Sequence, residues 1–205
     1  MGKQVECRVI GADIELDRQM IDQLADPVIH LLRNALDHGL ETPQAREALG
    51  KPPQGRITLS AWQDGSWAVI EVRDDGRGIS LQAIRDKVQQ KNLMTQEQLD
   101  ALSDQDVMDL IFLPGFSTSA MITDISGRGV GMDVVNDTVS RLDGTVSVES
   151  TEGEGTTVTL TLPVTVAIVK VLFVESGGEE YGIPIKTVDE ISRMRSLKRV
   201  DGTEV

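Results

Sequence analysis

The stretch that decides the fold is residues 26–41, DPVIHLLRNALDHGLE, which has the pattern of one amphipathic helix. At about 100° per residue, its apolar side chains fall on one continuous arc and its polar side chains fill the rest. The apolar arc predicts a helix that docks on a core and ends near Gly39. The apolar arc consists of Val28, Ile29, Leu31, Leu32, Ala35, Leu36 and Leu40, and the polar arc of His30, Arg33, Asn34, Asp37, His38 and Glu41.

The polar arc of this helix is the first candidate site. A polar stripe is usually a solvated helix face. This one carries both histidines of the chain, each four residues from Asn34, and few of the lysines and glutamates that normally cover exposed helices. We therefore favour metal and phosphate chemistry over a solvated face.

Composition limits the partners. The 205 residues suffice for one core of about 150 residues and a smaller piece. With 40% apolar residues and a net charge of −13, the chain is expected to be globular and to have neither nucleic acid nor an anionic membrane as its main partner. Its most apolar stretch, residues 164–174, is short and broken by Lys170, which predicts no membrane insertion.

A cytoplasmic location is expected from two observations, one on the N-terminus and one on the cysteine content. The N-terminus has no signal-peptide pattern. The single cysteine, Cys7, is in phase with Val5 and Val9, which predicts a buried strand residue in a reducing compartment with no metal or disulfide role.

Periodicity along the rest of the chain predicts strands and helices in irregular alternation. We expect helical periodicity from residue 16, with Pro27 at a helix start or bend, and a turn at Asp64-Gly65 between two strands. The predicted strands are 5–10, 57–61, 67–73, 145–149 and 156–162, and the other predicted helices are 41–51, 80–91, 96–102, 104–112 and 132–142. This order predicts an α+β fold in which helices cover one face of a mixed sheet.

A second polar cluster, Asp74-Asp75-Gly76-Arg77-Gly78-Ile79, follows the third strand. By period two, Asp74 points to the same side as Ile70 and Val72, which is the buried side. A buried carboxylate costs several kcal/mol unless it meets donors, and the exocyclic amine of adenine would supply them. The glycines permit a sharp turn and close approach to a flat ligand. A plain β-turn after a strand is the alternative.

A third cluster begins in residues 113–126, which have no clear periodicity and predict a lid or binding loop. This loop runs into Gly127-Arg128-Gly129-Val130-Gly131, where alternate glycines open a helix and predict a phosphate cradle. A Rossmann site is excluded because no strand precedes the glycines and their spacing differs. Lys87 and Lys91, one turn apart, are either surface lysines or phosphate partners.

The three clusters in this order, HLLRNALDHG, DDGRGI and GRGVGMDVV followed by GEGTT, resemble the ATP-binding domain of the GHKL superfamily. That superfamily includes gyrases, Hsp90-type chaperones, MutL proteins and histidine kinases. The segments FLPGFSTS and DISGRGVGMDVV make the sequence similar to the CheA family of chemotaxis histidine kinases. The resemblance implies a two-layer α/β sandwich of the Bergerat type at residues 1–163. Residues 164–205 resemble the truncated start of a CheW-like regulatory domain, a β-rich SH3-like fold.

The resemblance also implies roles for individual residues. Asn34 would be the protein ligand of a Mg²⁺ ion that bridges the ATP phosphates, and Asp74 would accept from adenine. The base pocket would be lined by Gly76, Gly78 and Ile79 and closed by Thr157. The phosphates would be held by Gly127, Arg128, Gly129, Val130, Gly131 and Met132, with further contacts from His30, Arg33, Asp37, His38, Lys87 and Lys91. The lid would contribute Phe116, Ser117, Thr118 and Ser126, whereas Phe112 is equally compatible with core packing.

One position separates the reactions within the superfamily. The hydrolysing branches have a water-activating glutamate four residues before the metal-binding asparagine, and this chain has His30 there. The resemblance therefore implies a histidine kinase that passes the γ-phosphoryl group of Mg-ATP to a histidine on a separate phosphotransfer domain of the same protein. The alternatives are an ATP-hydrolysing conformational clamp of the gyrase type and a non-catalytic nucleotide-binding module.

The implied partners follow from the same resemblance. They are the phosphotransfer domain, response regulators downstream, and a CheW-type adaptor and chemoreceptors that act through the regulatory domain. A dimer is expected only in the full-length protein.

Overall fold

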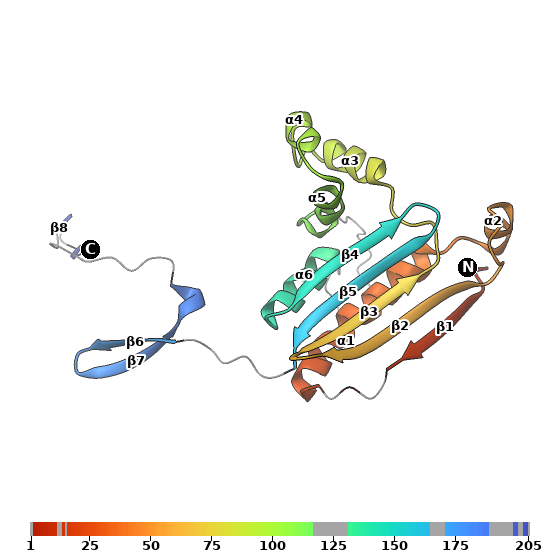
Figure 1. Cartoon of the computed structure of the whole chain (residues 1–205). Coiled ribbons are helices and arrows are strands. Elements are labelled where there is room, and N and C mark those ends of the chain that lie inside the picture. Colours follow the sequence, from red (N-terminus) through yellow and green to blue (C-terminus); the bar gives the residue numbers. More distant parts are fainter. Residues whose placement is uncertain are drawn as a thin grey trace. The chain divides into compact units, whose positions relative to one another are not determined.

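A five-stranded mixed sheet with the order β1-β2-β3-β5-β4 forms the frame of the fold (Figure 1). The computed structural model describes residues 2–11, 14, 16–116, 131–164, 171–188, 199–200 and 203–204. The strands are β1 (Val5–Ile10), β2 (Gly55–Asp64), β3 (Trp67–Asp74), β4 (Thr145–Thr151) and β5 (Gly155–Pro163). β1 is parallel to β2, and every other pairing in this sheet is antiparallel. The predicted mixed sheet is confirmed.

Helices cover one face of this sheet, with α1 and α6 side by side behind it in Figure 1. The helical segments of this unit are α1 (Arg18–Asn34), η1 (Ala35–Gly39), α2 (Pro43–Ala48), α3 (Leu81–Gln90), α4 (Gln96–Asp100), α5 (Asp104–Asp109), η2 (Leu110–Phe112) and α6 (Met132–Arg141). One apolar core lies between the two layers and includes Leu31, Val135, Val139 and Leu160. The predicted α+β two-layer sandwich is confirmed.

α1 begins at an N-cap, where the Asp17 carboxylate accepts a hydrogen bond from Gln19 N at 2.7 Å. The helix then continues through Pro27, so no helix starts at this proline, and a bend there stays a prediction. At Ala35 the helix changes to a π-helical turn, η1, which ends at Gly39 as predicted.

The apolar arc of α1 is only partly buried. Leu31 and Leu40 are 2% and 1% exposed, whereas Ile29 and Leu36 are 54% and 38% exposed, so their predicted burial is wrong. A helix that lies on a sheet buries a narrower stripe than its full apolar arc, and the π-helical turn changes the angle between successive residues. Glu41 is also misplaced on the polar arc, because the chain is already extended at Leu40.

The hairpin of β2 and β3 carries Asp74 to the helix-covered face. Gly65 has a φ of +60° in the turn, where Asp64 pairs with Trp67, as the Asp64-Gly65 pattern predicts. Along β3, Ile70, Val72 and Asp74 are buried at alternate positions, so the predicted burial of Asp74 is confirmed.

Cys7 is exposed, contrary to the prediction of a buried strand residue. It lies in β1, which is an edge strand whose residues from Cys7 to Ile10 are all exposed. Alternation of apolar residues specifies which side of a sheet they occupy, but not whether another layer covers that edge.

The chain divides into two compact units, Met1–Val166 and Ala167–Val205. In the second unit, β6 (Val171–Ser176) and β7 (Glu179–Pro184) form an antiparallel hairpin joined by Gly177-Gly178, and η3 (Ile185–Thr187) follows. β8 (Arg199–Val200) and β9 (Thr203–Glu204) form a short pair. Within the ranges described, no helix combines the length and apolar character needed to cross a membrane.

We predict that the Cys7 thiol reacts with Ellman's reagent in the native protein. Because the side chain is exposed, one equivalent should react in native buffer and denaturant should add little to the final absorbance. Cys7→Ser is the control and should give no signal, since the chain has no other cysteine. Reaction only after denaturation would contradict the exposed position of β1.

Candidate nucleotide-binding site

Asp74 at the end of β3 is a buried carboxylate, 6% exposed. Its Oδ1 accepts a hydrogen bond from Gly76 N at 2.9 Å, and the Thr156 backbone N–H also donates to the carboxylate. Burial raises the pKa of Asp74, the two backbone donors lower it, and the negative charges of Asp75 and Glu41 raise it further. A carboxylate has about four acceptor positions, so this one retains capacity for an external donor such as an amine.

Glycines let the backbone pack closely around Asp74. A Cβ at Gly39 would lie 3.0 Å from Asp74 Oδ2, and a Cβ at Gly76 would overlap the carbonyl group of Gly39. The Arg77 N–H donates to Gly39 O at 2.9 Å. The end of η1 therefore lies directly against the Asp74-Gly76 turn, which joins the first two polar clusters of the sequence.

The strand register contradicts the assignment of Thr157 to this side of the sheet. Asp74 pairs with Thr156, whereas Thr157 pairs with Arg73 and so faces the opposite side. Thr156 takes the place predicted for Thr157.

Ser150 is a residue of this region that sequence reasoning missed. Its hydroxyl accepts a hydrogen bond from Ile79 N and donates one to Gly155 O, each at 2.9 Å. The Ser150 and Thr156 hydroxyl oxygens also lie 2.9 Å apart. Gly78 precedes the held residue with a φ of +69°. Ser150 thus ties the DDGRGI turn to the start of β5, and no local pattern in the sequence marks it.

On the polar side of α1, His30 and Asn34 contact each other. Asn34 Nδ2 lies 3.0 Å from His30 Nε2 and 3.4 Å from Met132 Sδ on α6. Burial lowers the pKa of His30, as do the charges of Arg33 and His38, while Asp133 opposes them. A neutral His30 accepts the hydrogen bond from the amide nitrogen, and both contacts leave the Asn34 amide oxygen for another partner.

The other polar residues of this helix are more open. Arg33 and His38 are exposed and Asp37 is half-buried. Lys3, which sequence reasoning missed, donates from Nζ to Leu36 O and Asp37 O, each at 2.8 Å. Carbonyl groups near a helix C-terminus lack intrahelical partners, and a lysine there satisfies them.

Lys87 in α3 and Lys91 at the C-cap of this helix hold the segment that ends at Phe116. Lys91 Nζ donates to Gly115 O at 2.6 Å and to Phe116 O at 2.9 Å. Lys87 Nζ lies 4.5 Å from the centroid of the Phe116 ring, and burial lowers its pKa. Phe116 is 6% exposed and belongs to the core, while Phe112 is half-buried against it. These lysines are therefore not simple surface residues, and a phosphate contact remains a prediction.

The phosphate cradle falls largely outside the described residues. Ser117, Thr118, Ser126, Gly127, Arg128, Gly129 and Val130 all lie there. Gly131 is the N-cap residue of α6, and both Gly131 and Met132 are buried. Within the part of the chain that the structure describes, no three His, Cys, Asp or Glu side chains cluster so as to hold a metal ion.

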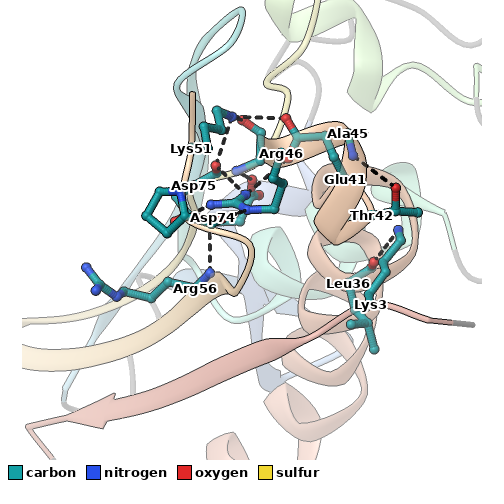
Figure 2. A network of polar contacts seen from close by, with 12 residues as sticks. Lys3, Leu36, Glu41, Thr42, Ala45, Arg46, Lys51, Arg56, Asp74 and Asp75 are labelled. Carbon is teal, nitrogen blue, oxygen red and sulfur yellow. Dashed lines mark hydrogen bonds and ion pairs between the residues drawn. The ribbon is translucent and has the colours of Figure 1, made fainter. Parts of the chain in front are cut away.

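A partly buried network of charged side chains adjoins the Asp74-Gly76 turn, and sequence reasoning missed it (Figure 2). Glu41 and Arg46 are 7% and 1% exposed, and Lys51 and Asp75 complete the network. The sequence suggested only a small charged helix here, because nothing local shows that these charges meet Asp75.

Residues 21–166 match the protein family described as "Histidine kinase-, DNA gyrase B-, and HSP90-like ATPase". The chain belongs to this family. The resemblance inferred from the three motifs is confirmed, and the family is one of ATP-binding domains.

Curated relatives narrow the similarity. The chain is 63% identical over 203 residues to "Chemotaxis protein CheA" of Halobacterium salinarum, covering 99% of this chain and 30% of that protein. It is 43% identical to the CheA of Bacillus subtilis, with 93% and 28% covered. It is 44% identical to the "Gliding motility regulatory protein" of Myxococcus xanthus, with 98% and 26% covered. The chain therefore spans less than a third of the length of these relatives.

Asp74→Asn is expected to raise the melting temperature of the ATPase domain without nucleotide at neutral pH. The folded pKa of Asp74 lies above the ordinary value of 3.8, so the contribution of this group to the stability of the wild-type domain is largest below that value and is lost as the pH rises through the folded pKa. The neutral amide avoids this loss. Scanning fluorimetry from about pH 4 to pH 8 measures it, since the gap between variant and wild type should widen with pH.

Asp64→Asn, in the exposed hairpin turn, is the matched control and should show no such widening. A melting temperature of Asp74→Asn that stays parallel to that of the wild type across this range would contradict the burial of an ionised carboxylate.

Proposed function

We propose that this chain is the catalytic domain of a chemotaxis histidine kinase, which binds Mg-ATP and transfers its γ-phosphoryl group to a histidine of a separate phosphotransfer domain. The observation that carries the proposal is the contact between His30 and Asn34 at 3.0 Å. It supports a metal site in which His30 orients a ligand, and it argues against His30 as a free base for water.

Asp74 is proposed to recognise adenine. Its buried carboxylate has capacity for the exocyclic amine, and Gly76, Gly78, Ile79 and Thr156 surround it as the walls of a base pocket. The fit is supported by the close packing of Gly39 against the carboxylate, which leaves no room for a larger side chain.

Asn34 is proposed to bind Mg²⁺ through its amide oxygen. Mg²⁺ commonly takes few protein ligands and keeps waters and phosphate oxygens for the rest, which suits a single amide. When bound, Mg²⁺ would neutralise phosphate charge. His30 and Met132 contact the amide nitrogen, which would leave the amide oxygen free for the ion.

The phosphates are proposed to lie at Gly127, Gly129 and Gly131, beside Arg128, Val130 and Met132. Arg33, Asp37, His38, Lys87 and Lys91 would lie within reach of the phosphates, with Ser117, Thr118 and Ser126 from the lid. In the transfer step, a nitrogen of the acceptor imidazole bonds to the γ-phosphorus, the bond to the bridging oxygen breaks, and ADP leaves.

The clamp function is the alternative, and the electrostatics of His30 disfavour it. Because burial lowers the pKa of His30, its Nε2 carries a lone pair at neutral pH, but the Asn34 amide already donates to that atom. A water molecule in line with the γ-phosphate would therefore lack a base at this position.

The proposal extends to the whole protein that contains this chain. Residues 1–163 would form the kinase catalytic domain, and residues 164–205, which include the β6–β7 hairpin, would begin a CheW-like domain with an SH3-like fold. Partners would be the phosphotransfer domain, response regulators, a CheW-type adaptor and chemoreceptors, in the cytoplasm. Dimerisation is expected only in the full-length protein.

Asn34→Ala should weaken Mg-ATP by about tenfold or more while ADP without Mg²⁺ binds about as before. The substitution removes the proposed metal ligand but leaves the base pocket intact. Calorimetry with each ligand measures the two affinities. Asn136→Ala on α6 is the matched control and should change neither, and equal losses for both ligands in Asn34→Ala would contradict the assignment.

The test of the whole proposal uses γ-labelled ATP. The chain alone should hydrolyse Mg-ATP barely above background and should not label itself, because its only histidines, His30 and His38, lie in α1 and η1, where the proposal gives them contacts to the nucleotide. Adding a separately made histidine phosphotransfer domain should move the label to that domain. Rapid phosphate release by the chain alone, abolished by His30→Ala, would overturn the kinase proposal in favour of the clamp.

A further inference from the structure

Arg46 is the most buried charged side chain of the described residues, and two of its four hydrogen bonds go to Asp75, the residue after Asp74. Nε donates to Pro52 O at 2.7 Å, Nη1 donates to Glu41 Oε2 and Asp75 O at 3.1 Å each, and Nη2 donates to Asp75 Oδ2 at 3.0 Å. It is 1% exposed. A buried ion pair is often no more stabilising than an apolar replacement of the same volume. The role of Arg46 is therefore sought in the backbone groups that it holds in place, rather than in the free energy of unfolding.

Lys51 binds the same turn from the same side. Its Nζ donates to Asp75 O at 3.1 Å, to Gly76 O at 2.7 Å and to Glu41 Oε1 at 3.0 Å. Glu41 thus joins the two cations, as Figure 2 shows. Three cationic hydrogen bonds converge on two successive carbonyl groups, and charge-assisted bonds of this kind are shorter and stronger than neutral ones.

Asp75 is held from a second direction as well. Its Oδ1 accepts from Arg56 N at 2.8 Å, and its own N–H donates to Arg56 O at 3.2 Å. Both faces of the Asp75 peptide are therefore fixed, one by β2 and one by the cations. The chain from Asp75 to Gly76 has little freedom to shift.

The fixed turn controls the carboxylate of Asp74 through Gly76. The Gly76 N–H donates to Asp74 Oδ1 at 2.9 Å, so the position of this peptide sets the direction of the carboxylate. Loss of either cation would free the Asp75 and Gly76 carbonyl groups and let the Gly76 N–H shift, which would turn the Asp74 carboxylate away from its present direction.

We propose that Arg46 and Lys51 are positioning residues for base recognition, which aim the Asp74 carboxylate by holding the Asp75 and Gly76 carbonyl groups from behind. This inference rests on the proposed function, in which Asp74 accepts from the adenine amine. It assigns selectivity for a 6-amino purine to side chains that lie outside the nucleotide pocket.

The test compares ATP with ITP, which carries a carbonyl oxygen where adenine carries the amine. Arg46→Met and Lys51→Met should each lower the ratio of ATP to ITP affinity by about tenfold, the effect of losing one well-aimed charged hydrogen bond. ITP affinity should change much less. Arg46→Lys should restore part of the ratio because it returns a cation to the carbonyl of Asp75.

Arg85→Met is the matched control. Arg85 is partly buried, donates to Leu99 O at 2.7 Å and pairs with Asp104, and none of its contacts with the described residues involves Asp74, Asp75 or Gly76. Denaturant unfolding of each variant without nucleotide shows whether it is folded. A loss of stability with an unchanged ATP to ITP ratio would overturn the inference, and Lys51→Met decides the question if Arg46→Met does not fold.

Asp74→Ala separates this inference from the proposed function. If Asp74→Ala leaves the ATP to ITP ratio unchanged, the adenine assignment itself is wrong and the inference falls with it. If Asp74→Ala abolishes the selectivity while Arg46→Met and Lys51→Met retain it, the adenine assignment stands and the positioning role is wrong.

Discussion

The burial of one carboxylate, Asp74, is the constraint on which the rest of this domain depends. An ionised carboxylate away from water needs donors, and the nearby backbone provides them through Gly76 and Thr156. These contacts bring the end of β3, the start of β5 and the last turn of η1 to one place. The glycine at position 39 follows from the same constraint, because a side chain there would press on the carboxylate.

A second contact joins the two helices that cover the sheet. The Asn34 amide on α1 reaches His30 one turn before it and Met132 at the start of α6. Asn34 and Met132 are far apart in the chain, so the amide links α1 to the start of α6. Since Gly39 packs against Asp74, the end of the helix formed by α1 and η1 and the Asp74-Gly76 turn lie at the same end of the sheet.

Sequence reasoning predicted the features that depend on local periodicity. Asp74 follows two buried residues in phase with it, so its burial was predictable, and Asp64-Gly65 marked the hairpin. Features that depend on a distant partner were not predictable in the same way. The assignment of Thr157 failed by one residue because a glycine turn between strands leaves the register open. The Glu41–Arg46 ion pair was not predicted because Arg46 also pairs with Asp75, which is far away in the sequence. The burial of Cys7 was predicted wrongly because its strand lies at an uncovered edge of the sheet.

The order of the strands has a consequence for folding. β3 lies between β2, its immediate neighbour in the chain, and β5, which follows only after α3 to α6. Pairing across so long a segment is slow, because closure entropy is lost before the contacts form. We expect the Asp74 to Thr156 contact to form late. A ligand that binds beside it would stabilise contacts absent from the folding transition state, and would therefore lengthen the lifetime of the folded domain more than it speeds folding.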